Sequence, residues 1–323
     1  MLFFFSVAYL WDPTRVGVCP YTNDMRRIID ILRALGDLIL PRTCVVCGCT
    51  LGLRERHLCL ACAADVPYTR FWLQAHNSLA DRFNAVLERH RGTEPMDYAY
   101  AAALLYYKGA YRNIPRALKY HYNLSVGRFY GALLGRRLAA APHLQDIDLV
   151  IPVPLHWARQ WSRGYNQAEV LARAIVVGFL EESVRAGNDG GSTSSPTVTP
   201  GLTESLPTCR TDLLVRTRRT RTQTKLSVEE KARNVASAFR VPERQSLLDR
   251  VLHSRFNLLR HSRLDRESPR TTLASARHIL LVDDTFTTGA TLYACYAALR
   301  PYSTARISVA TLAAVEGTPG GGP

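Results

Sequence analysis

The sequence predicts an α/β fold, a doubly wound and mainly parallel sheet that follows a small N-terminal cysteine module. The C-terminal part is the clearest, because an apolar strand at 278–282 is followed by a polar turn, a helix at 289–300 and a strand at 305–312. Strand, helix and strand at this spacing indicate parallel pairing. Two pairs of closely spaced cysteines within residues 42–66 predict the module.

The remaining elements are predicted from the periodicity of apolar residues. Strands are expected at 98–107 and 148–153, where the chain is apolar. Helical spacing predicts further helices at 25–41, 78–90, 111–122, 126–141 and 166–180. Residues 212–215 are expected to form a short strand, and a capping-box pattern opens a predicted helix at 227–239.

Changes in composition divide the chain into parts. The predicted parts are an N-terminal extension with an amphipathic helix at 1–41, a zinc-ribbon module at 42–66, a main domain at 67–316 and a disordered tail at 317–323. Two flexible insertions are expected in the main domain, at 181–208, which is rich in Gly, Ser, Thr and Pro, and at 243–276, which is charged and irregular. Translation is expected to begin at either Met1 or Met25.

The chain is basic, with 41 Lys and Arg against 27 Asp and Glu and a formal net charge of +14. Such an excess favours polyanionic ligands, either phosphates or nucleic acid, although a solvated basic surface explains the charge equally well. Residues 1–10 are apolar, but they lack a preceding basic region and are too short to span a bilayer. We therefore expect a cytoplasmic protein whose paired cysteines bind metal instead of forming disulfides.

The paired cysteines have the spacing of a closed zinc site. Cys44 and Cys47 form one C-x-x-C pair, and Cys59 and Cys62 form the second. Four thiolates complete the tetrahedral shell of zinc, so the metal is expected to be structural and not catalytic. The alternative is that these thiols hold no metal. Cys49 lies beside the pairs, and the sequence leaves open whether it competes as a ligand or is a spare thiol.

The strand at 278–282 ends in two acids and opens into a turn of threonines and glycine before the next helix. A helix N-terminus here presents unpaired N–H groups and a positive dipole to an anion. The candidate phosphate-binding residues are Thr285, Thr287, Thr288, Gly289, Ala290 and Thr291. Asp283 and Asp284 would repel a phosphate, but carboxylates accept hydrogen bonds from ribose hydroxyls. The turn therefore suits a ribose 5-phosphate, and an ordinary helix cap is the alternative.

The run Leu281–Thr291 (LVDDTFTTGAT) resembles the phosphoribosyl pyrophosphate (PRPP) motif of type I phosphoribosyltransferases. Residues 151–155 (IPVPL) and 163–168 (RGYNQA) resemble the ComF family, the competence-associated members of that superfamily. Two further blocks of the family are matched by Tyr107, Lys119 and Tyr120 and by Arg216, Thr220, Gln223, Leu226, Arg233, Asn234 and Phe239. The likeness runs from Cys44 to about Leu312, apart from the two insertions.

This resemblance implies a type I phosphoribosyltransferase fold with an N-terminal zinc ribbon and a site for PRPP and Mg²⁺. Asp283 and Asp284 would be the catalytic acids that position the ribose. Pyrophosphate would be covered by a loop and a mobile lid that include Pro154, Leu155, Arg163, Gly164, Asn166, Arg216, Thr220, Gln223 and Lys225. The basic residues can neutralise phosphate oxygens. Solvated surface charge is the alternative for each arginine, and helix capping is the alternative for Asn166.

The function expected from the resemblance is PRPP binding by a protein of DNA uptake, competence or use of DNA. Mg-dependent phosphoribosyl transfer is the enzymatic form of this expectation, with an acceptor that the sequence does not identify. The alternative is a non-catalytic competence factor, in which the basic lid and zinc ribbon grip single-stranded DNA near Trp161 and Tyr165, and the PRPP turn is regulatory or vestigial. The sequence leaves open whether catalysis occurs and which oligomeric state the protein adopts.

Overall fold

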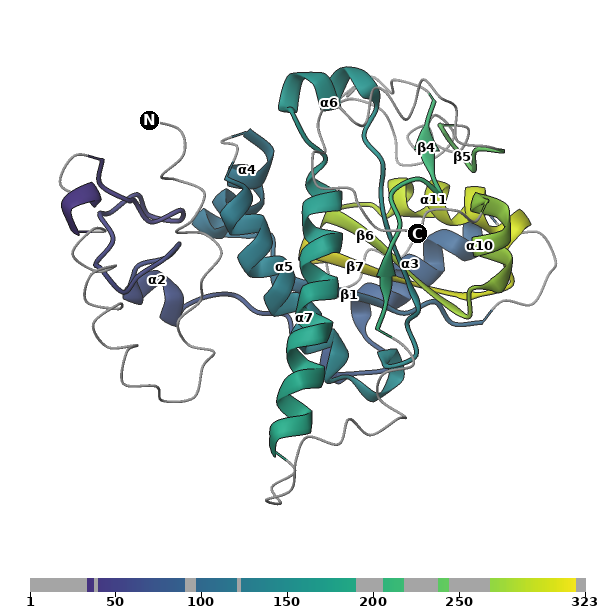
Figure 1. Ribbon diagram of the computed structural model, residues 1–323, viewed down its shortest axis with the longest axis horizontal. Helices are drawn as coiled ribbons and strands as arrows, with labels where there is room; N and C mark the ends of the chain where they lie inside the picture. Colours follow the sequence, from purple (N-terminus) through teal and green to yellow (C-terminus); the bar gives the residue numbers. More distant parts are fainter. Residues whose placement is uncertain are drawn as a thin grey trace. The chain divides into compact units, whose positions relative to one another are not determined.

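The chain divides into two compact units, Met1–Val66 and Pro67–Pro323. Of its 323 residues, the computed structural model describes 34–37, 40–90, 97–120, 123–189, 206–217, 238–243 and 268–317. The first unit contains the cysteine module and the short helix α2 (Leu60–Ala64). The second unit contains the sheet and the helices that pack on it (Figure 1).

Five parallel strands form the sheet of the second unit (Figure 1). Their order is β1 (Ala101–Tyr106), β7 (Arg306–Ala314), β6 (His278–Phe286), β2 (Leu149–Pro152) and β3 (Thr208–Cys209). Each neighbouring pair is parallel, so the predicted α/β class with a mainly parallel sheet is confirmed. A separate antiparallel pair is formed by β4 (Val215–Arg216) and β5 (Phe239–Arg240).

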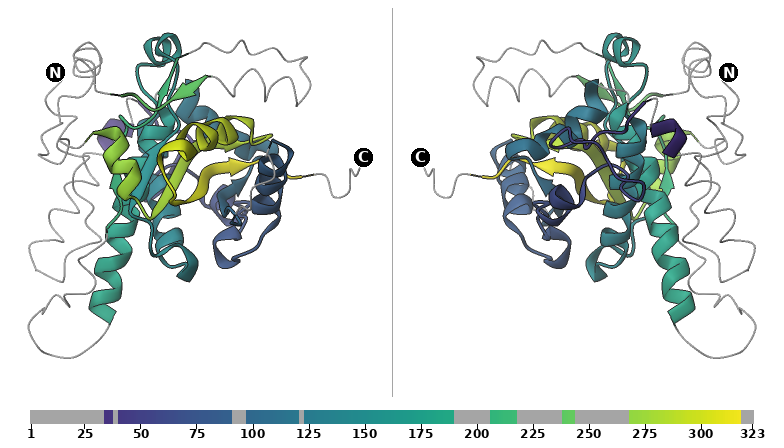
Figure 2. Two further views of the ribbon diagram at one scale, coloured as in Figure 1. Left: turned by 90° about the vertical axis from the view of Figure 1, so that its right-hand side faces the viewer. Right: turned by 90° about the vertical axis from the view of Figure 1, so that its left-hand side faces the viewer.

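Helices cover both faces of the sheet because the chain crosses it in both directions. From β1 to β2 and on to β3 the chain moves toward one edge, through α5 (Leu124–Ala139) and α7 (Gln167–Asp189). From β6 to β7 it moves back, through α11 (Ala290–Leu299). Right-handed crossovers therefore place α5 and α7 on one face and α11 on the other. Figure 2 shows this arrangement, with α3 (Ser78–Arg89) beside α11.

Within the described residues of the second unit, the other helical segments are α4 (Asn113–Tyr120), α6 (Trp157–Arg163), α10 (Pro269–Ser275) and the 3-10 turns Phe71–Leu73, Gly109–Arg112, Pro142–Leu144 and Arg300–Tyr302. The helices predicted at 78–90, 111–122, 126–141 and 289–300 correspond to α3, α4, α5 and α11 and are confirmed within the described residues. The strands predicted at 98–107, 148–153 and 305–312 correspond to β1, β2 and β7 and are also confirmed.

Both ends of the predicted insertion at 181–208 are wrong. α7 continues to Asp189, because Glu181, Glu182 and Arg185 favour helix and the composition changes only afterwards. At the other end Thr208 already belongs to β3, which pairs with β2. Sheet pairing with an existing edge, which local composition does not reveal, accounts for this short strand.

Three further boundaries differ from the prediction. The strand expected at 212–215 lies at Val215–Arg216, and Phe239, the predicted end of a helix, lies in β5 opposite Arg216. The predicted insertion at 243–276 includes α10 at its end. Of the helix predicted at 25–41, the structure describes residues 34–37, which are helical, and residues 40–41, which are not. Residues 1–33, 190–205, 218–237, 244–267 and 318–323, and the predictions that fall there, lie outside the described residues.

The central strand β6 is longer than predicted, and this places the acidic pair on the sheet. The apolar segment Ile279–Val282 is fully buried, as expected for a strand covered on both faces. Beyond Val282 the pairing with β7 continues, with Asp283 opposite Thr311 and Phe286 opposite Ala314. The carboxyl groups therefore stand on a strand and not in a loose turn.

Candidate functional site

The predicted phosphate turn lies where β6 ends. β2 ends at the same edge of the sheet, since Pro152 pairs with Val282 and the Val153 N–H donates to the Val282 carbonyl at 2.8 Å. A small pocket at this edge is lined by Asp283, Thr285, Phe286, Thr287, Gly289, Ala290, Thr291 and Leu292. The structure thus brings most of the predicted PRPP-binding residues to one pocket, while Asp284 and Thr288 adjoin it in the chain.

Gly289 lets the chain pass from the turn into α11. Its φ of +77° lies in the left-handed region, and a β-carbon there would come within 3.0 Å of the Phe286 ring. The Tyr293 N–H donates back to the Gly289 carbonyl at 2.8 Å, so the amides of residues 290–292 have no acceptor within the helix. The Ala290 N–H donates to the Thr288 hydroxyl at 3.5 Å, and the Thr291 and Leu292 amides are donors that an anion would meet at the start of α11.

The two acids at the end of β6 have different partners. Asp284 forms an ion pair with Lys119 on α4, with 2.9 Å between Oδ1 and Nζ. Lys119 also lies 3.4 Å from the Thr285 hydroxyl. Burial alone would lower the pKa of Lys119, but the charges of Asp284 and Asp283 outweigh it and raise this pKa. Lys119 is therefore a cation fixed beside the predicted ribose-binding acids.

Asp283 is the acid that titrates near neutral pH. It accepts the Asp284 backbone N–H at 2.8 Å. Burial, and then the charge of Asp284, raise the pKa of Asp283 to about 7, against the opposing effects of the Asp284 N–H, Lys119 and Arg216. A carboxyl group with such a pKa in a pocket is typical of functional sites, because it can bind or release a proton at physiological pH.

The loop after β2 is short and leads directly into α6. Pro154 and Leu155 are half-buried at its start, and His156 caps α6 by accepting the Ala158 N–H on Nδ1 at 3.2 Å. Gly164 ends the helix with a φ of +69°. The predicted pyrophosphate loop is therefore a short irregular segment followed by a capped helix at the carboxyl end of β2.

Asn166 has a structural explanation. Its Nδ2 donates to the Val153 carbonyl at 3.0 Å, and its Oδ1 accepts the Ala168 N–H at 3.1 Å. The side chain is buried. Oδ1 therefore caps the start of α7 while Nδ2 ties it to the end of β2, and these two contacts explain this residue without a ligand.

Arg216 is a predicted lid residue within the described part, and its charge acts on the acidic pair. Its guanidinium lies 5.2 Å from the Phe239 ring centroid, and its charge lowers the pKa of Asp283. Arg163 donates to Gln167 Oε1 at 3.1 Å and lies 5.4 Å from the Tyr120 ring centroid. The remaining predicted lid residues, Thr220, Gln223 and Lys225, lie outside the described residues.

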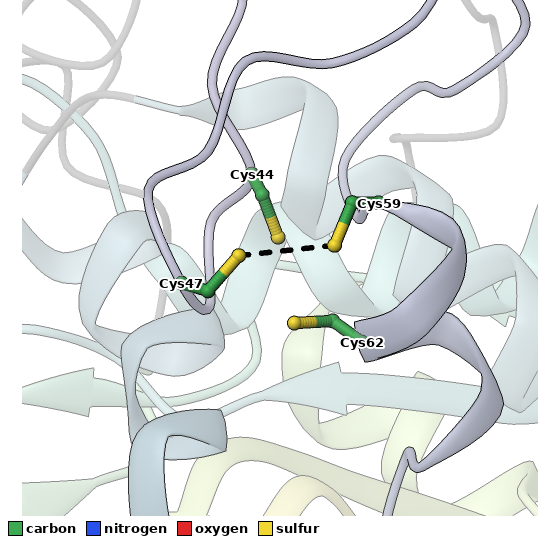
Figure 3. Close-up of side chains that lie close together, drawn as sticks. All are labelled: Cys44, Cys47, Cys59 and Cys62. Carbon is green, nitrogen blue, oxygen red and sulfur yellow. Dashed lines mark hydrogen bonds between the residues drawn. The ribbon is translucent and has the colours of Figure 1, made fainter.

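Four cysteines of the first unit are positioned to hold a metal ion (Figure 3). The sulfur atoms of Cys44, Cys47, Cys59 and Cys62 all lie within 4.8 Å of one another. A tetrahedral zinc site with Zn–S bonds of about 2.3 Å requires sulfur atoms about 3.8 Å apart, and the Cys47–Cys59 separation is 3.7 Å. The predicted cluster is therefore confirmed in its residues and fits zinc.

The backbone of the module favours the thiolate form of Cys47, whereas burial raises the pKa of Cys62. The Cys49 backbone N–H is the largest of the effects that lower the pKa of Cys47 to about 6. Gly48 makes the turn possible with a φ of +77°, and its N–H donates to the Cys44 carbonyl at 2.9 Å. The Cys49 sulfur lies 3.3 Å from that of Cys47, yet Cys49 is not among the four cysteines whose sulfur atoms share one centre.

No protein-family model matches this chain, and no curated protein matches it in sequence. Within the part of the chain that the structure describes, none of the helices has both the length and the apolar character needed to cross a bilayer.

Proposed function

We propose that this chain binds PRPP at residues 283–291, the end of β6 and the turn that follows it, and is a ComF-type protein with a type I phosphoribosyltransferase fold. The observation that carries the proposal is an acidic pair near the end of the central strand, followed by a turn and by a helix whose N-cap glycine has no side chain to cap it. The 5-phosphate would accept hydrogen bonds from the amides and hydroxyls of the turn. The ribose hydroxyls would donate to Asp283 and Asp284.

Two arginines would bind the pyrophosphate end of PRPP. Arg163 and Arg216 would neutralise pyrophosphate oxygens, which arginine can bind in a bidentate manner. Oxygen donors such as the two acids also suit a hard cation, and Mg²⁺ bound with PRPP would stabilise the departing pyrophosphate oxygens. In phosphoribosyl transfer the acids would hold the ribose in place while positive charge develops on its ring. In this role the protein acts in the cytoplasm, in DNA uptake or the use of DNA.

Titration of the full chain with PRPP and Mg²⁺ in a calorimeter tests this proposal. We expect binding by the wild type, and a loss of at least about tenfold in affinity for Asp284→Ala, since hydrogen bonds to a charged group are lost. Asp284→Ala also leaves Lys119 without its carboxylate, so the variant should be less stable. Adding Lys119→Met should restore stability without restoring PRPP binding. A wild type that gives no binding, or an Asp284→Ala variant that binds PRPP normally, would refute the proposal.

A second candidate function, binding of single-stranded DNA, is favoured by α6. Trp157 and Trp161 lie one helical turn apart and are 72% and 76% exposed. Arg163 on the same helix lies over Tyr120, which is 64% exposed. Exposed aromatic and basic side chains are the groups on which unpaired bases stack and to which phosphates bind.

The salt dependence of DNA binding tests this second function. We expect affinity for an oligothymidine to fall steeply as salt rises. Trp157→Ala with Trp161→Ala should weaken binding by about 1–3 kcal/mol for each base that stacks. Leu73→Ala, at a residue 69% exposed and outside α6, serves as the control. DNA affinity that changes neither with salt concentration nor on replacing the two tryptophans would count against DNA binding at α6.

A further inference from the structure

Helix α3 holds the phosphate turn through one arginine that the proposed function does not use. Arg82 Nη2 donates to the Thr287 carbonyl at 2.9 Å, and Nη1 donates to the Val315 carbonyl at 2.6 Å. The guanidinium also lies 5.3 Å from the centroid of the Phe286 ring. Arg82 thus joins α3 to the turn after β6 and to the end of β7.

This contact fixes the orientation of one peptide group in the turn. In a trans peptide the carbonyl and the N–H point in opposite directions, so holding the Thr287 carbonyl directs the Thr288 N–H away from Arg82. Thr287 lines the pocket. Without Arg82, rotation of this peptide could turn a carbonyl oxygen toward the pocket, where it would repel a phosphate instead of leaving room for N–H donors.

Other side chains of α3 pack against the same turn. Phe83 meets the Phe286 ring edge-on, with 6.3 Å between the centroids. A methyl group of Val86 would lie 3.6 Å from a β-carbon placed on Gly289. The Val315 N–H donates to the Phe286 carbonyl at 3.0 Å. These contacts pack the base of the turn, whereas Arg82 alone among these three α3 residues binds a carbonyl of the turn.

We propose that Arg82 is a positioning residue for phosphate recognition, which acts by keeping the Thr287 carbonyl out of the anion site. This inference rests on the proposed function, since it concerns the same turn. It assigns Arg82 to the 5-phosphate end of the ligand and not to the pyrophosphate end. Removing Arg82 should therefore lower the affinity for ligands that carry a sugar 5-phosphate. The affinity for ligands that bind only through the pyrophosphate side should not change.

Two probes, ribose 5-phosphate and Mg-pyrophosphate, test this division in the full chain. For Arg82→Ala we expect affinity for ribose 5-phosphate to fall at least about tenfold, with affinity for Mg-pyrophosphate changed less than about twofold. Arg82→Lys keeps the charge but can hold only one carbonyl well. Its affinity for ribose 5-phosphate should therefore lie between that of the wild type and that of Arg82→Ala. Arg89→Ala is the matched control, because Arg89 is exposed in the last turn of the same helix. The changes in backbone amide chemical shift of Thr288 and Gly289 on adding ribose 5-phosphate should be smaller in Arg82→Ala than in the wild type. In Arg89→Ala these changes should equal those of the wild type.

The outcomes separate the inference from the proposed function. Wild-type chain that binds neither probe would overturn the proposed function, and this inference with it. Wild-type binding with undiminished ribose 5-phosphate affinity in Arg82→Ala would overturn the inference alone. Equal losses for both probes in Arg82→Ala and in the folded Arg82→Lys would also overturn it, because they would indicate general damage and not control of one peptide.

Discussion

Replacing Cys44 with serine is expected to remove the metal from the N-terminal unit and to unfold its cysteine module. Within the described residues of this unit, the buried apolar side chains are only Cys44, Val46 and Leu51. So small a core cannot offset the entropy of ordering the chain. A structural zinc site contributes roughly 10–16 kcal/mol of apparent binding energy, which is then folding energy. Metal analysis should show zinc falling from about one per chain, and limited proteolysis should cut within residues 42–66.

Cys49 provides the matched control for this experiment. Its sulfur lies 3.3 Å from that of Cys47, but the four sulfur atoms that share one centre belong to other cysteines. Cys49→Ser should therefore keep its zinc and its resistance to protease. The second unit should keep its thermal transition in both variants, because its core consists of its own strands and helices. Loss of zinc from Cys49→Ser, or its retention by Cys44→Ser, would mean that the ligand set is different.

Local patterns in the sequence were enough to predict the sheet around the site. Residues 278–312 contain a buried strand, a turn and a helix in direct succession, and each has a strong apolar period or a glycine at its boundary. Parallel pairing of β6 with β7 follows from that succession, because a helix between two strands returns the chain to the same direction. The four clustered cysteines were predictable for the same reason, since they lie in two short pairs.

Contacts between distant segments could not be predicted in this way. Lys119 was matched to a family block, but its ion pair with Asp284 joins residues far apart in the chain. Arg82 carried no signal at all, because its partners are the carbonyls of Thr287 and Val315, and any residue supplies a carbonyl. The predicted end of β6 at Val282 was wrong for a related reason, since pairing with β7 and not local hydrophobicity extends the strand.

Replacing Asp283 with asparagine is expected to stabilise the protein at alkaline pH and to weaken PRPP binding. The pKa of Asp283 in the folded chain is raised from 3.8 to about 7, so between those pH values the folded state holds a proton that the unfolded state has released. Stability therefore falls as pH rises through this window. Asparagine has no proton to lose and can still accept the Asp284 N–H. At pH 8 we expect Asp283→Asn to gain roughly 1–3 kcal/mol in free energy of unfolding.

Urea unfolding of both proteins at pH 5 and pH 8 would measure this gain, which should be present at pH 8 and small at pH 5. PRPP binding should change in the opposite direction to stability, because ribose hydroxyls would donate to the ionised carboxylate that the variant lacks. Wild-type affinity should thus rise with pH, by up to about tenfold per pH unit below the pKa, and Asp283→Asn should lose that part of the dependence. The phosphates of PRPP also titrate near pH 6, but they do so equally with both proteins. An Asp283→Asn variant less stable than the wild type at pH 8 would contradict this prediction. It would show that the neighbours of Asp283 stabilise its ionised form, so that the carboxylate does not lower the free energy of unfolding.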